Sequence, residues 1–350
     1  MDQNLFYNGS KLLSMKDIDG NLPAIYAVDG NRSDGKTTFF ARKLIRDFKK
    51  HGKKFMIIKR YKYQIYKTHL TFFALVNQHW FPDDKLTAKK GENGLYMELF
   101  LNDMPCGYVC DLNSAEKLKE YSQFYCDTDQ IFMDEFQAKE YVPDEITNFG
   151  ILYSSTARGY GTPVRYVPVY MCCNHVSSLN PYYKAWKCGA IVDGIKKGFY
   201  RGHGVVVERD FNEKISNMQK ESAFMKAFSS ADFVKHVTEN ESFVDNFSFV
   251  EKVKTGKFDY ICNIHVDGEV ISLVRVLDVD HVRYYFSDNV NLNCNCNFTI
   301  FSSDHCEDTL LLNRNIDFLN MLKSNFDHGF IRFSSLEVKE KAFAFLSIMV

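Results

Sequence analysis

One short segment of the sequence combines glycine, lysine and threonine at a spacing suited to binding phosphates. It reads Gly30-Asn-Arg-Ser-Asp-Gly-Lys-Thr37 and fits the pattern GxxxxGK[ST] at every fixed position. Terminal glycines let the chain fold tightly, so that successive backbone N–H groups can point at phosphate oxygens. The lysine reaches the β- and γ-phosphates, and the threonine coordinates Mg²⁺. We therefore expect a nucleotide site made of Gly30, Asn31, Arg32, Ser33, Asp34, Gly35, Lys36, Thr37 and Thr38.

A pair of adjacent acidic residues after an apolar run is the second chemical signal. The run Gln130-Ile-Phe-Met leads into Asp134 and Glu135. At the carboxyl end of a strand, Asp134 would hold Mg²⁺, and Glu135 would reach the water that attacks the γ-phosphate. Two surface acids after a strand are the alternative reading. The pair favours ATP and Mg²⁺ as cofactors of an ATPase, and the sequence has no NKxD motif for reading guanine.

Two further polar residues fit this machinery. Asn174 follows the apolar run 167–173, where its amide would sense the γ-phosphate, although an ordinary strand-end asparagine fits the sequence equally well. Arg158 follows a helical pattern. A loop arginine can stabilise transition-state charge in a neighbouring subunit's site, whereas most loop arginines are simply solvated. The candidate catalytic residues are therefore Lys36, Glu135, Arg158 and Asn174.

The charge of the chain is concentrated in one stretch. The 43 Lys and Arg and 44 Asp and Glu give a net charge of −1, which by itself argues against a nucleic-acid binder. Between Lys36 and Lys62, however, eleven basic residues and one acidic residue give +10, so the other 323 residues sum to −11. This stretch ends in Lys59-Arg-Tyr-Lys-Tyr63, where cations alternate with aromatic rings, as contacts with phosphates and sugars require. The candidate nucleic-acid contacts are Lys59, Arg60 and Lys62, and a solvated face is the alternative.

Cysteine content and apolar runs limit the environments that the chain suits. Ten cysteines in 350 residues, two of them adjacent at Cys172 and Cys173, indicate reduced thiols rather than a disulfide scaffold. One loose group fits no standard zinc spacing: Cys294, Cys296, His305 and Cys306. The first residues do not resemble a secretory signal, and no run approaches about 18 apolar residues. We expect an intracellular protein that does not enter a membrane.

The elements that must position these residues follow a parallel α/β pattern in the first half of the chain. Short apolar runs predict strands at 24–28, 55–58, 131–133, 167–173 and 205–207. A helix is predicted over 36–50, because Phe40, Leu44 and Phe48 recur every four residues. Turn signals within 85–107 predict an inserted hairpin. The phosphate-binding pattern therefore lies between a strand and a helix, as its mechanism requires.

The pattern changes after about residue 208. Two short helical patterns occupy 212–240, with Ile215, Met218 and Phe224 in the first and Phe233, Val234 and Val237 in the second. Strands are predicted at 247–253, 260–266, 270–277 and 282–286, and an Asp-Gly turn makes the second and third antiparallel. Helices at 313–325 and 337–350 follow. We expect an ATPase domain at 1–209, a helical linker at 210–243 and an α+β domain at 244–350.

Five blocks of the sequence occur in a known order. They are Leu5-Phe-Tyr-Asn8, the phosphate-binding pattern, Ile58-Lys-Arg-Tyr-Lys62, Phe132-Met-Asp-Glu-Phe136 and Cys173-Asn-His-Val-Ser-Ser-Leu-Asn-Pro-Tyr182. In these blocks the sequence resembles the phi-29-type DNA-packaging ATPases of small podophages. The phosphate-binding and acidic blocks are common to a larger ATPase class, whereas the third and fifth blocks make the resemblance specific.

The resemblance implies an α/β P-loop NTPase of the additional-strand, catalytic-glutamate class. A small helical linker and a C-terminal RNase H-like domain that has lost its metal-binding carboxylates would follow. Such proteins form a pentameric ring at the portal vertex of a procapsid in the host cytoplasm, together with a structural packaging RNA. They use ATP to drive double-stranded DNA inward.

The resemblance also implies residue roles. Lys36 and Thr37 would bind phosphates and Mg²⁺, Asp134 the metal, and Glu135 would be the catalytic glutamate. Arg158 would be an arginine finger that acts across the subunit interface. Asn174 would sense the γ-phosphate, and Lys62 would contact DNA in the pore. The chain departs from the family pattern at Ser33-Asp34, where a glycine and an apolar residue are common. Arg165 is an alternative to Arg158, and a basic residue acting on the neighbouring site can also come from Lys117 or Lys119.

The C-terminal part bears on nuclease activity. Two-metal cleavage needs several carboxylates that converge on the ions. The available acids lie mostly at predicted turns and strand ends, where aspartate is ordinary: Asp259, Asp267, Asp278, Asp280 and Asp288. We therefore predict no nuclease activity and expect this domain to bind RNA, the portal or the DNA backbone. The alternatives are a terminase-like ATPase with an active nuclease and a nucleotide-gated nucleic-acid-binding protein.

Overall fold

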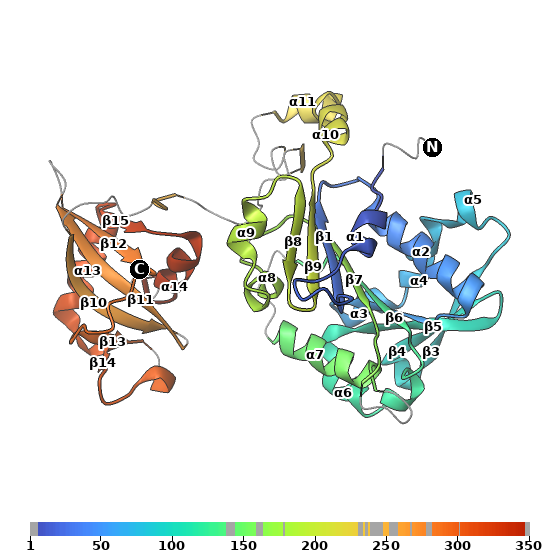
Figure 1. Cartoon of the computed structure of the whole chain (residues 1–350), viewed down its shortest axis with the longest axis horizontal. Helices are drawn as coiled ribbons and strands as arrows, with labels where there is room; N and C mark the ends of the chain where they lie inside the picture. Colours follow the sequence, from blue (N-terminus) through green and yellow to red (C-terminus); the bar gives the residue numbers. More distant parts are fainter. Residues whose placement is uncertain are drawn as a thin grey trace. The chain divides into compact units, whose positions relative to one another are not determined.

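The computed structural model describes most of the 350-residue chain. The described residues are 6–137, 144–158, 164–177, 179–229, 234, 237–238, 248–251, 258–266, 268–277, 282–300 and 302–346. The chain divides into two compact units, Met1–Val244 and Asp245–Val350 (Figure 1). Each unit is built around a sheet of its own.

The first unit contains a nine-stranded sheet in the order β3-β4-β5-β2-β6-β7-β1-β9-β8. Its strands are β1 (Ile25–Gly30), β2 (Phe55–Lys59), β3 (Leu86–Gly91), β4 (Tyr96–Leu101), β5 (Met104–Asp111), β6 (Gln130–Asp134), β7 (Val169–Asn174), β8 (Gly198–Gly202) and β9 (Val205–Asp210). The six central strands run parallel, while β3, β4 and β8 are antiparallel to their neighbours. Strand β7 lies between β1, which leads into the phosphate-binding pattern, and β6, which carries the acidic pair. This inserted strand confirms the additional-strand class of P-loop fold.

Helices cover both faces of this sheet. The helices of the first unit are α1 (Ser10–Ser14), α2 (Lys36–His51), α3 (Lys62–Ile65), α4 (Thr68–Ala74), α5 (Asn77–Trp80), α6 (Ala115–Lys119), α7 (Glu145–Thr156), α8 (Pro181–Ala185), α9 (Gly189–Asp193), α10 (Glu213–Lys220) and α11 (Ala223–Ala227), of which α10 and α11 lie beyond the end of the sheet. Helix α2 packs Phe40, Leu44 and Phe48 onto one face, and α6, α7 and α8 pack onto the other (Figure 1). Alternate strand residues supply the two cores, as the pleat of a strand requires.

The predicted elements of the first unit are found, with small shifts at their ends. The helix predicted at 36–50 is α2, which follows Gly35 and ends at Gly52, both in the left-handed conformation. The inserted hairpin is β3 and β4, and β4 pairs with β5. In the predicted linker, α10 buries Ile215, whereas Met218 and Phe224 are exposed. Most of the second helical pattern, including Phe233, lies outside the described residues.

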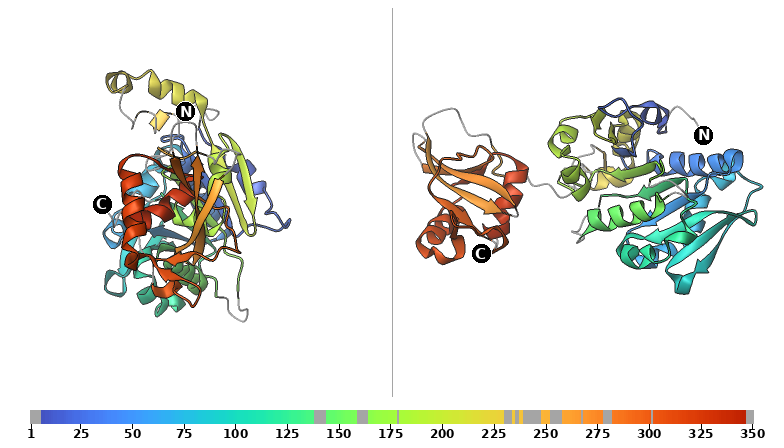
Figure 2. Two further views of the ribbon diagram at one scale, coloured as in Figure 1. Left: turned by 90° about the vertical axis from the view of Figure 1, so that its left-hand side faces the viewer. Right: turned by 60° about the horizontal axis from the view of Figure 1, so that its bottom comes forward.

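The second unit contains a six-stranded sheet in the order β14-β13-β10-β11-β12-β15. Figure 2 shows this unit, in orange to red, from two further sides. Its strands are β10 (Phe258–Val266), β11 (Glu269–Leu277), β12 (Val282–Ser287), β13 (Asn297–Thr299), β14 (Leu310–Leu311) and β15 (Ile331–Phe333), and helices α13 (Ile316–Asp327) and α14 (Leu336–Leu346) pack on them. The first three strands are antiparallel, as predicted, and β13 and β14 continue the sheet in parallel from β10. This arrangement is the expected α+β RNase H-like domain.

Parts of the second unit differ from the sequence prediction. Among the described residues, the strand expected at 247–253 is reduced to a single bridge between Val250 and Phe333. Strands β13, β14 and β15 were not predicted, because two or three residues are too short to show a period of two. Within the described part of the chain, no helix has the length and apolar character needed to cross a membrane.

Candidate functional site

The phosphate-binding loop connects β1 to α2, and each of its two glycines is required for a different structural reason. A Cβ atom on Gly30 would lie 2.3 Å from the backbone oxygen of Asp210, so only glycine fits beside β9. Gly35 has φ = 94°, a left-handed conformation that other residues rarely adopt. The loop therefore has the sharp turn that directs its backbone N–H groups and the amino end of α2 toward one point.

Lys36 is held by its own loop. Its Nζ atom donates to the Asn31 backbone oxygen at 2.5 Å and to Asp34 Oδ2 at 2.9 Å. Both Lys36 and Asp34 are buried, and burial raises the pKa of Asp34 although Lys36 opposes the shift. Asp34, one of the two departures from the family pattern, is thus an internal counter-ion of the lysine that is expected to bind phosphates.

Thr37 and Asp134 meet across the sheet. The hydroxyl of Thr37 donates to Asp134 Oδ1 at 3.1 Å, although 97 residues separate the two in sequence. Strand β7, which lies between β1 and β6 in the sheet, contributes the Cys172 thiol, and this thiol donates to the same carboxylate oxygen at 3.0 Å. A hydroxyl and a carboxylate are oxygen ligands of the kind that Mg²⁺ binds. The donor set therefore fits the expected metal.

Glu135 has an unusual backbone conformation. Its φ is 57°, in the left-handed region, and its backbone N–H donates to the Cys172 oxygen at 2.7 Å. Its side chain is exposed, whereas Asp134 is half-buried and the other residues of β6 are buried. Asn174 ends β7 in register with Gly30, so it lies beside the phosphate-binding loop. The structure therefore brings both residues to the carboxyl edge of the sheet, where Lys36 also lies.

A pocket of about 760 Å³ opens beside the loop. Its walls combine residues 33–39 with Asn174 and with side chains from four other segments, including Phe6, Asn8, Arg42, Arg46, His79 and Trp80. The Arg42 guanidinium lies 5.0 Å from the Trp80 ring centroid. Sequence reasoning did not assign these wall residues. The block at Leu5–Asn8 was a signal for Phe6 and Asn8, but His79 and Trp80 belong to no motif.

A buried cluster of polar groups lies under this edge. Asp29, which is fully buried in β1, accepts hydrogen bonds from Tyr183 at 2.8 Å and Gln137 at 3.2 Å. Its carboxylate also lies 2.7 Å from His175 Nδ1 and 3.0 Å from Arg209 Nη1. Burial alone would raise the pKa of Asp29, but His175 and Arg209 outweigh it and lower that pKa. The cluster joins the segments that follow β6 and β7.

Two arginines were candidates for a finger that acts on a neighbouring subunit. Arg165 donates from Nη2 to three backbone oxygens, at 2.5 Å for Cys126, 2.7 Å for Thr128 and 3.3 Å for Thr156. Arg158 lies just beyond the end of α7, is exposed, and makes no hydrogen bond within the described part of the chain. Of the two arginines, Arg158 is thus the exposed one without a hydrogen bond to the described residues. Lys117 and Lys119 are exposed on α6.

The three predicted nucleic-acid contacts do not share one environment. Lys62 begins α3 and is exposed next to Tyr63, whose ring stacks on Tyr61 at 5.7 Å. Lys59 is half-buried at the end of β2. Arg60 is only 10% exposed and pairs with Glu145 at 2.7 Å. Its guanidinium is bonded inside the protein, which argues against the predicted nucleic-acid contact of Arg60.

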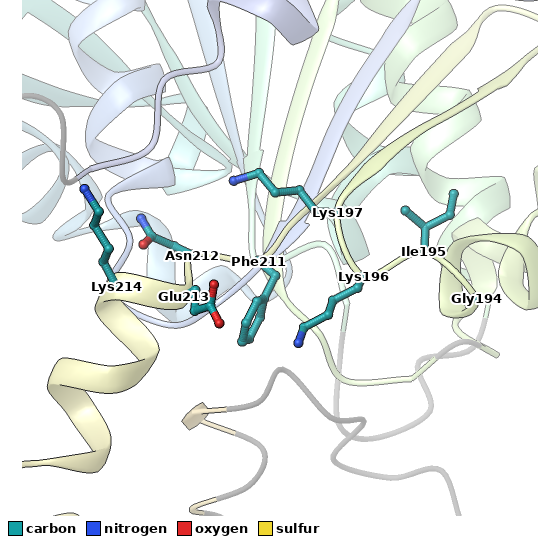
Figure 3. Close-up of a pocket in the computed structure, with 8 residues that line it drawn as sticks. All are labelled: Gly194, Ile195, Lys196, Lys197, Phe211, Asn212, Glu213 and Lys214. Atoms are coloured by element: carbon teal, nitrogen blue, oxygen red, sulfur yellow. The ribbon is translucent and has the colours of Figure 1, made fainter.

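The linker helix α10 is bonded to the back of the phosphate-binding loop. The Asn212 backbone N–H donates to Asn31 Oδ1 at 2.7 Å, and Gln219 donates to the Arg32 backbone oxygen at 3.1 Å. A pocket of about 790 Å³ lies beside this junction, between residues 194–197 and 211–214. Figure 3 shows Lys196 alongside Phe211, while Lys197 and Lys214 point away. Its lysines do not converge, so this pocket is a weaker site candidate than the pocket at the loop.

Among the described residues of the second unit, the polar groups do not form a cluster of carboxylates. The parallel strands β10 and β13 place Asn263 opposite Asn297, and their amides are hydrogen-bonded at 2.8 Å. Asp259 is exposed and pairs with Arg275 at 2.6 Å. Asp267, Asp278 and Asp280 lie outside the described residues.

The described residues include all ten cysteines and the loose group of possible metal ligands. All ten cysteines are free thiols, as predicted. No group of three or more His, Cys, Asp or Glu residues that could hold a metal ion is found in the described part. The loose group that contains Cys294 and His305 is thus not drawn together into such a group.

Comparisons with known proteins agree on one family. The model of the podovirus DNA encapsidation protein (Gp16) matches residues 1–350. The DNA packaging protein of Bacillus phage phi29 is 24% identical over 350 residues, which cover 98% of this chain and 97% of that protein.

Two solved structures are similar over nearly their whole length. The bacteriophage Phi-29 viral genome packaging motor assembly has a TM-score of 0.71 at 21% identity, with 99% of this chain and 100% of that chain covered. The Phi-28 gp11 DNA packaging motor has a TM-score of 0.60 at 15% identity, with 97% of each chain covered. At these identities, both show that the fold is shared. Because the family model spans the entire sequence, the chain belongs to the podovirus DNA encapsidation protein (Gp16) family.

Proposed function

We propose that this protein is an ATPase that drives double-stranded DNA into a phage procapsid. The observation that carries the proposal is the contact between Thr37 and Asp134, 3.1 Å apart, beside a P-loop lysine and next to Glu135. These are the parts that phosphoryl transfer to water requires: a phosphate cradle, oxygen ligands for a metal, and a base. The family match supplies DNA encapsidation as the task that hydrolysis would drive.

Each residue at the edge has a separate task in this proposal. The loop N–H groups and Lys36 bind the β- and γ-phosphates, and Thr37 and Asp134 hold Mg²⁺. When bound, Mg²⁺ neutralises charge that develops on the phosphates. Glu135 orients the attacking water and accepts its proton. Asn174, beside the loop at the end of β7, senses whether the γ-phosphate is present.

In this proposal, Arg158 acts on the nucleotide of the neighbouring subunit in a homo-oligomeric ring. The family resemblance implies that this ring is a pentamer. The exposure of Arg158 supports this role, and so does the use of Arg165 within the protein. Mixed rings test it. Glu135→Gln subunits still carry Arg158, so Arg158→Ala subunits mixed with them should hydrolyse ATP at every interface that pairs an intact Glu135 with an intact neighbouring arginine. If the ATPase activity of the mixture equals the sum of the activities of the two variants measured separately, Arg158 does not act across the interface.

The remaining partners follow from the task. Lys62 and Lys59 contact the DNA backbone, and the exposed Tyr63 ring lies beside them. The ring works at the portal vertex of the procapsid in the host cytoplasm, with a structural packaging RNA. The second unit binds RNA, the portal or DNA backbone and does not cut DNA, because its facing strand residues Asn263 and Asn297 are amides.

Encapsidation itself is the direct test of the task. Wild-type protein, procapsids, packaging RNA, DNA and MgATP should give DNA that resists added nuclease, and Glu135→Gln should give none. Metal-dependent cutting of plasmid that is lost in Asp259→Ala would instead support the nuclease alternative. Protection of DNA by Glu135→Gln at the wild-type level would favour the nucleotide-gated binding protein.

A further inference from the structure

We propose that Arg60, paired with Glu145, is a positioning residue that fixes the peptide carrying Glu135. This inference rests on the proposed ATPase function and deepens it. It assigns a task to the cation of the basic stretch that does not face nucleic acid. The argument uses the hydrogen bonds of Arg60, the conformation of Glu135 and the burial of Glu145.

Arg60 bonds directly to the segment that contains Glu135. Strands β2 and β6 are parallel neighbours, so Arg60, just after β2, lies beside the carboxyl end of β6. Its Nη1 donates to the Glu135 backbone oxygen at 3.1 Å, and its Nη2 donates to the Phe136 backbone oxygen at 2.9 Å. One guanidinium therefore holds two consecutive carbonyl groups, a geometry that its planar fork suits and a lysine ammonium does not.

The conformation of Glu135 explains why such bonds are needed. A non-glycine residue with a φ of 57° is in a sparsely populated region, which persists only where the surroundings fix it. On one side, the N–H groups of Glu135 and Phe136 both donate to the Cys172 oxygen, at 2.7 and 3.3 Å. On the other side, Arg60 holds the two carbonyls. The turn that aims the Glu135 side chain out of the sheet is thus bonded from both sides.

Glu145 fixes the guanidinium itself. Its Oε1 accepts from Arg60 Nη2 at 2.7 Å and from Nε at 3.3 Å, and the carboxylate is 1% exposed. Glu145 is the first residue of α7, where the helix dipole favours a negative charge. A buried carboxylate at a helix start and a guanidinium with two further acceptors form a rigid support, because each group is held by more than one hydrogen bond.

The same helix leads to the predicted finger. Arg158 lies two residues beyond α7, and a helix of 12 residues spans roughly 18 Å. The peptide of Glu135 and the arginine offered to the next subunit are therefore attached near opposite ends of one rigid element.

Kinetics with a charge swap separates positioning from plain stabilisation. The full-length protein is assayed for steady-state ATP hydrolysis with DNA and procapsids, for binding of a fluorescent ATP analogue, and for its melting temperature. We expect Arg60→Ala and Arg60→Lys to lower kcat about 10- to 100-fold, because the catalytic group is misplaced, while the Kd for the analogue changes less than about twofold. The double variant Arg60→Glu with Glu145→Arg restores opposite charges but cannot donate from position 60 to the carbonyls. It should recover the melting temperature without recovering kcat.

Arg201 provides a matched control. It too donates to two consecutive backbone oxygens, those of Lys16 and Asp17, at a place away from β6. Arg201→Ala should leave kcat within about twofold of wild type, because the Glu135 peptide is untouched. Wild-type kcat in Arg60→Ala, loss of ATP affinity alone, or full recovery of kcat in the charge swap would each overturn the inference. If the wild type and Glu135→Gln hydrolyse ATP equally, the proposed function fails instead.

Discussion

The sheets of the two units bring polar residues together in the same way, but the residue types differ. In both, parallel neighbouring strands bring polar side chains from distant parts of the chain next to each other. In the first unit, β1 and β7 do so for Asp29 and His175, and β6 carries Asp134 to Thr37. In the second unit, β10 and β13 do so for Asn263 and Asn297.

The difference teaches that the fold supplies the meeting point and the side chains decide the chemistry. In the first unit, Asp29 lies next to cationic groups, and Asp134 accepts hydrogen bonds from a hydroxyl and a thiol. These surroundings stabilise negatively charged carboxylates at the edge where metal and phosphate are expected to bind. The amide pair of the second unit satisfies itself without charge. Each unit should therefore resist a substitution that gives it the other unit's residue type.

Replacing the buried carboxylate of the first unit by an amide should have the largest effect. Asp29→Asn removes the buried carboxylate that pairs with Arg209 and His175 and should lower the free energy of unfolding by about 3–5 kcal/mol. The measurement is amide hydrogen exchange of β1 and β7 in the full chain, with β10 as an internal reference. Equal protection in the variant and the wild type would show that the cluster is not a charge-matched core.

The pH dependence of that unit provides a check on the same cluster. The pKa of Asp29 is lower in the folded chain than its ordinary value of 3.8. Its stabilisation is therefore complete above that ordinary value and is lost as the pH falls below it. Asp29→Asn should remove this acid-dependent part of the exchange profile of β1.

The reverse substitution should have a smaller effect in the second unit. In Asn263→Asp, the new carboxylate would face the Asn291 backbone oxygen and Asn297 Oδ1, both of which now accept from Asn263 Nδ2. A buried carboxylate facing two acceptors should cost about 1–3 kcal/mol, read from exchange of β10 and β13. Asn263→Ala, which removes the bonds without adding charge, is the control. A variant as stable as wild type would mean that this strand pair tolerates charge.

Asp34 allows a functional test of charge in the first unit. Asp34→Asn removes the carboxylate that now pairs with Lys36 at 2.9 Å, so the lysine is freer to bind phosphates. The Kd for a fluorescent ATP analogue should fall about three- to tenfold, which corresponds to a binding free energy more favourable by about 1 kcal/mol. Lys36→Ala is the control and should abolish binding. Weaker binding by Asp34→Asn would show that Asp34 supports the lysine rather than competing for it.

The exposed cations should give the smallest effect. Each lost phosphate contact lowers the slope of log affinity against log salt by about 0.9, so Lys59→Ala with Lys62→Ala should flatten it by about one to two units. Arg60→Ala should leave the slope unchanged, because its side chain is 10% exposed and internally paired. A slope that responds to Arg60 and not to the lysines would reverse the assignment.

Local sequence signals predicted the central parts of the site, and contacts between distant segments decided the rest. The phosphate-binding loop and Asp134-Glu135 are continuous patterns, so they could be read directly. The role of Arg60 could not, because its partner Glu145 lies 85 residues away and a count of charges says nothing about burial. His79 and Trp80 were missed for the same reason, since the fold alone brings them to the pocket.

The fold was predictable to a similar extent. Apolar runs gave the central parallel strands, whereas β13, β14 and β15 are too short to show a period. The left-handed turn at Glu135 had no signal in the sequence, because glycine or asparagine usually marks such a turn.

Single-turnover hydrolysis by Glu135→Gln tests the central claim most directly. With excess protein, DNA and MgATP, the variant should bind ATP as tightly as wild type but release phosphate at least about 100-fold more slowly, because the base that accepts the water proton is gone. This result would identify the carboxyl edge of the nine-stranded sheet as the site of hydrolysis. Phosphate release at the wild-type rate, with ATP bound normally, would contradict the account.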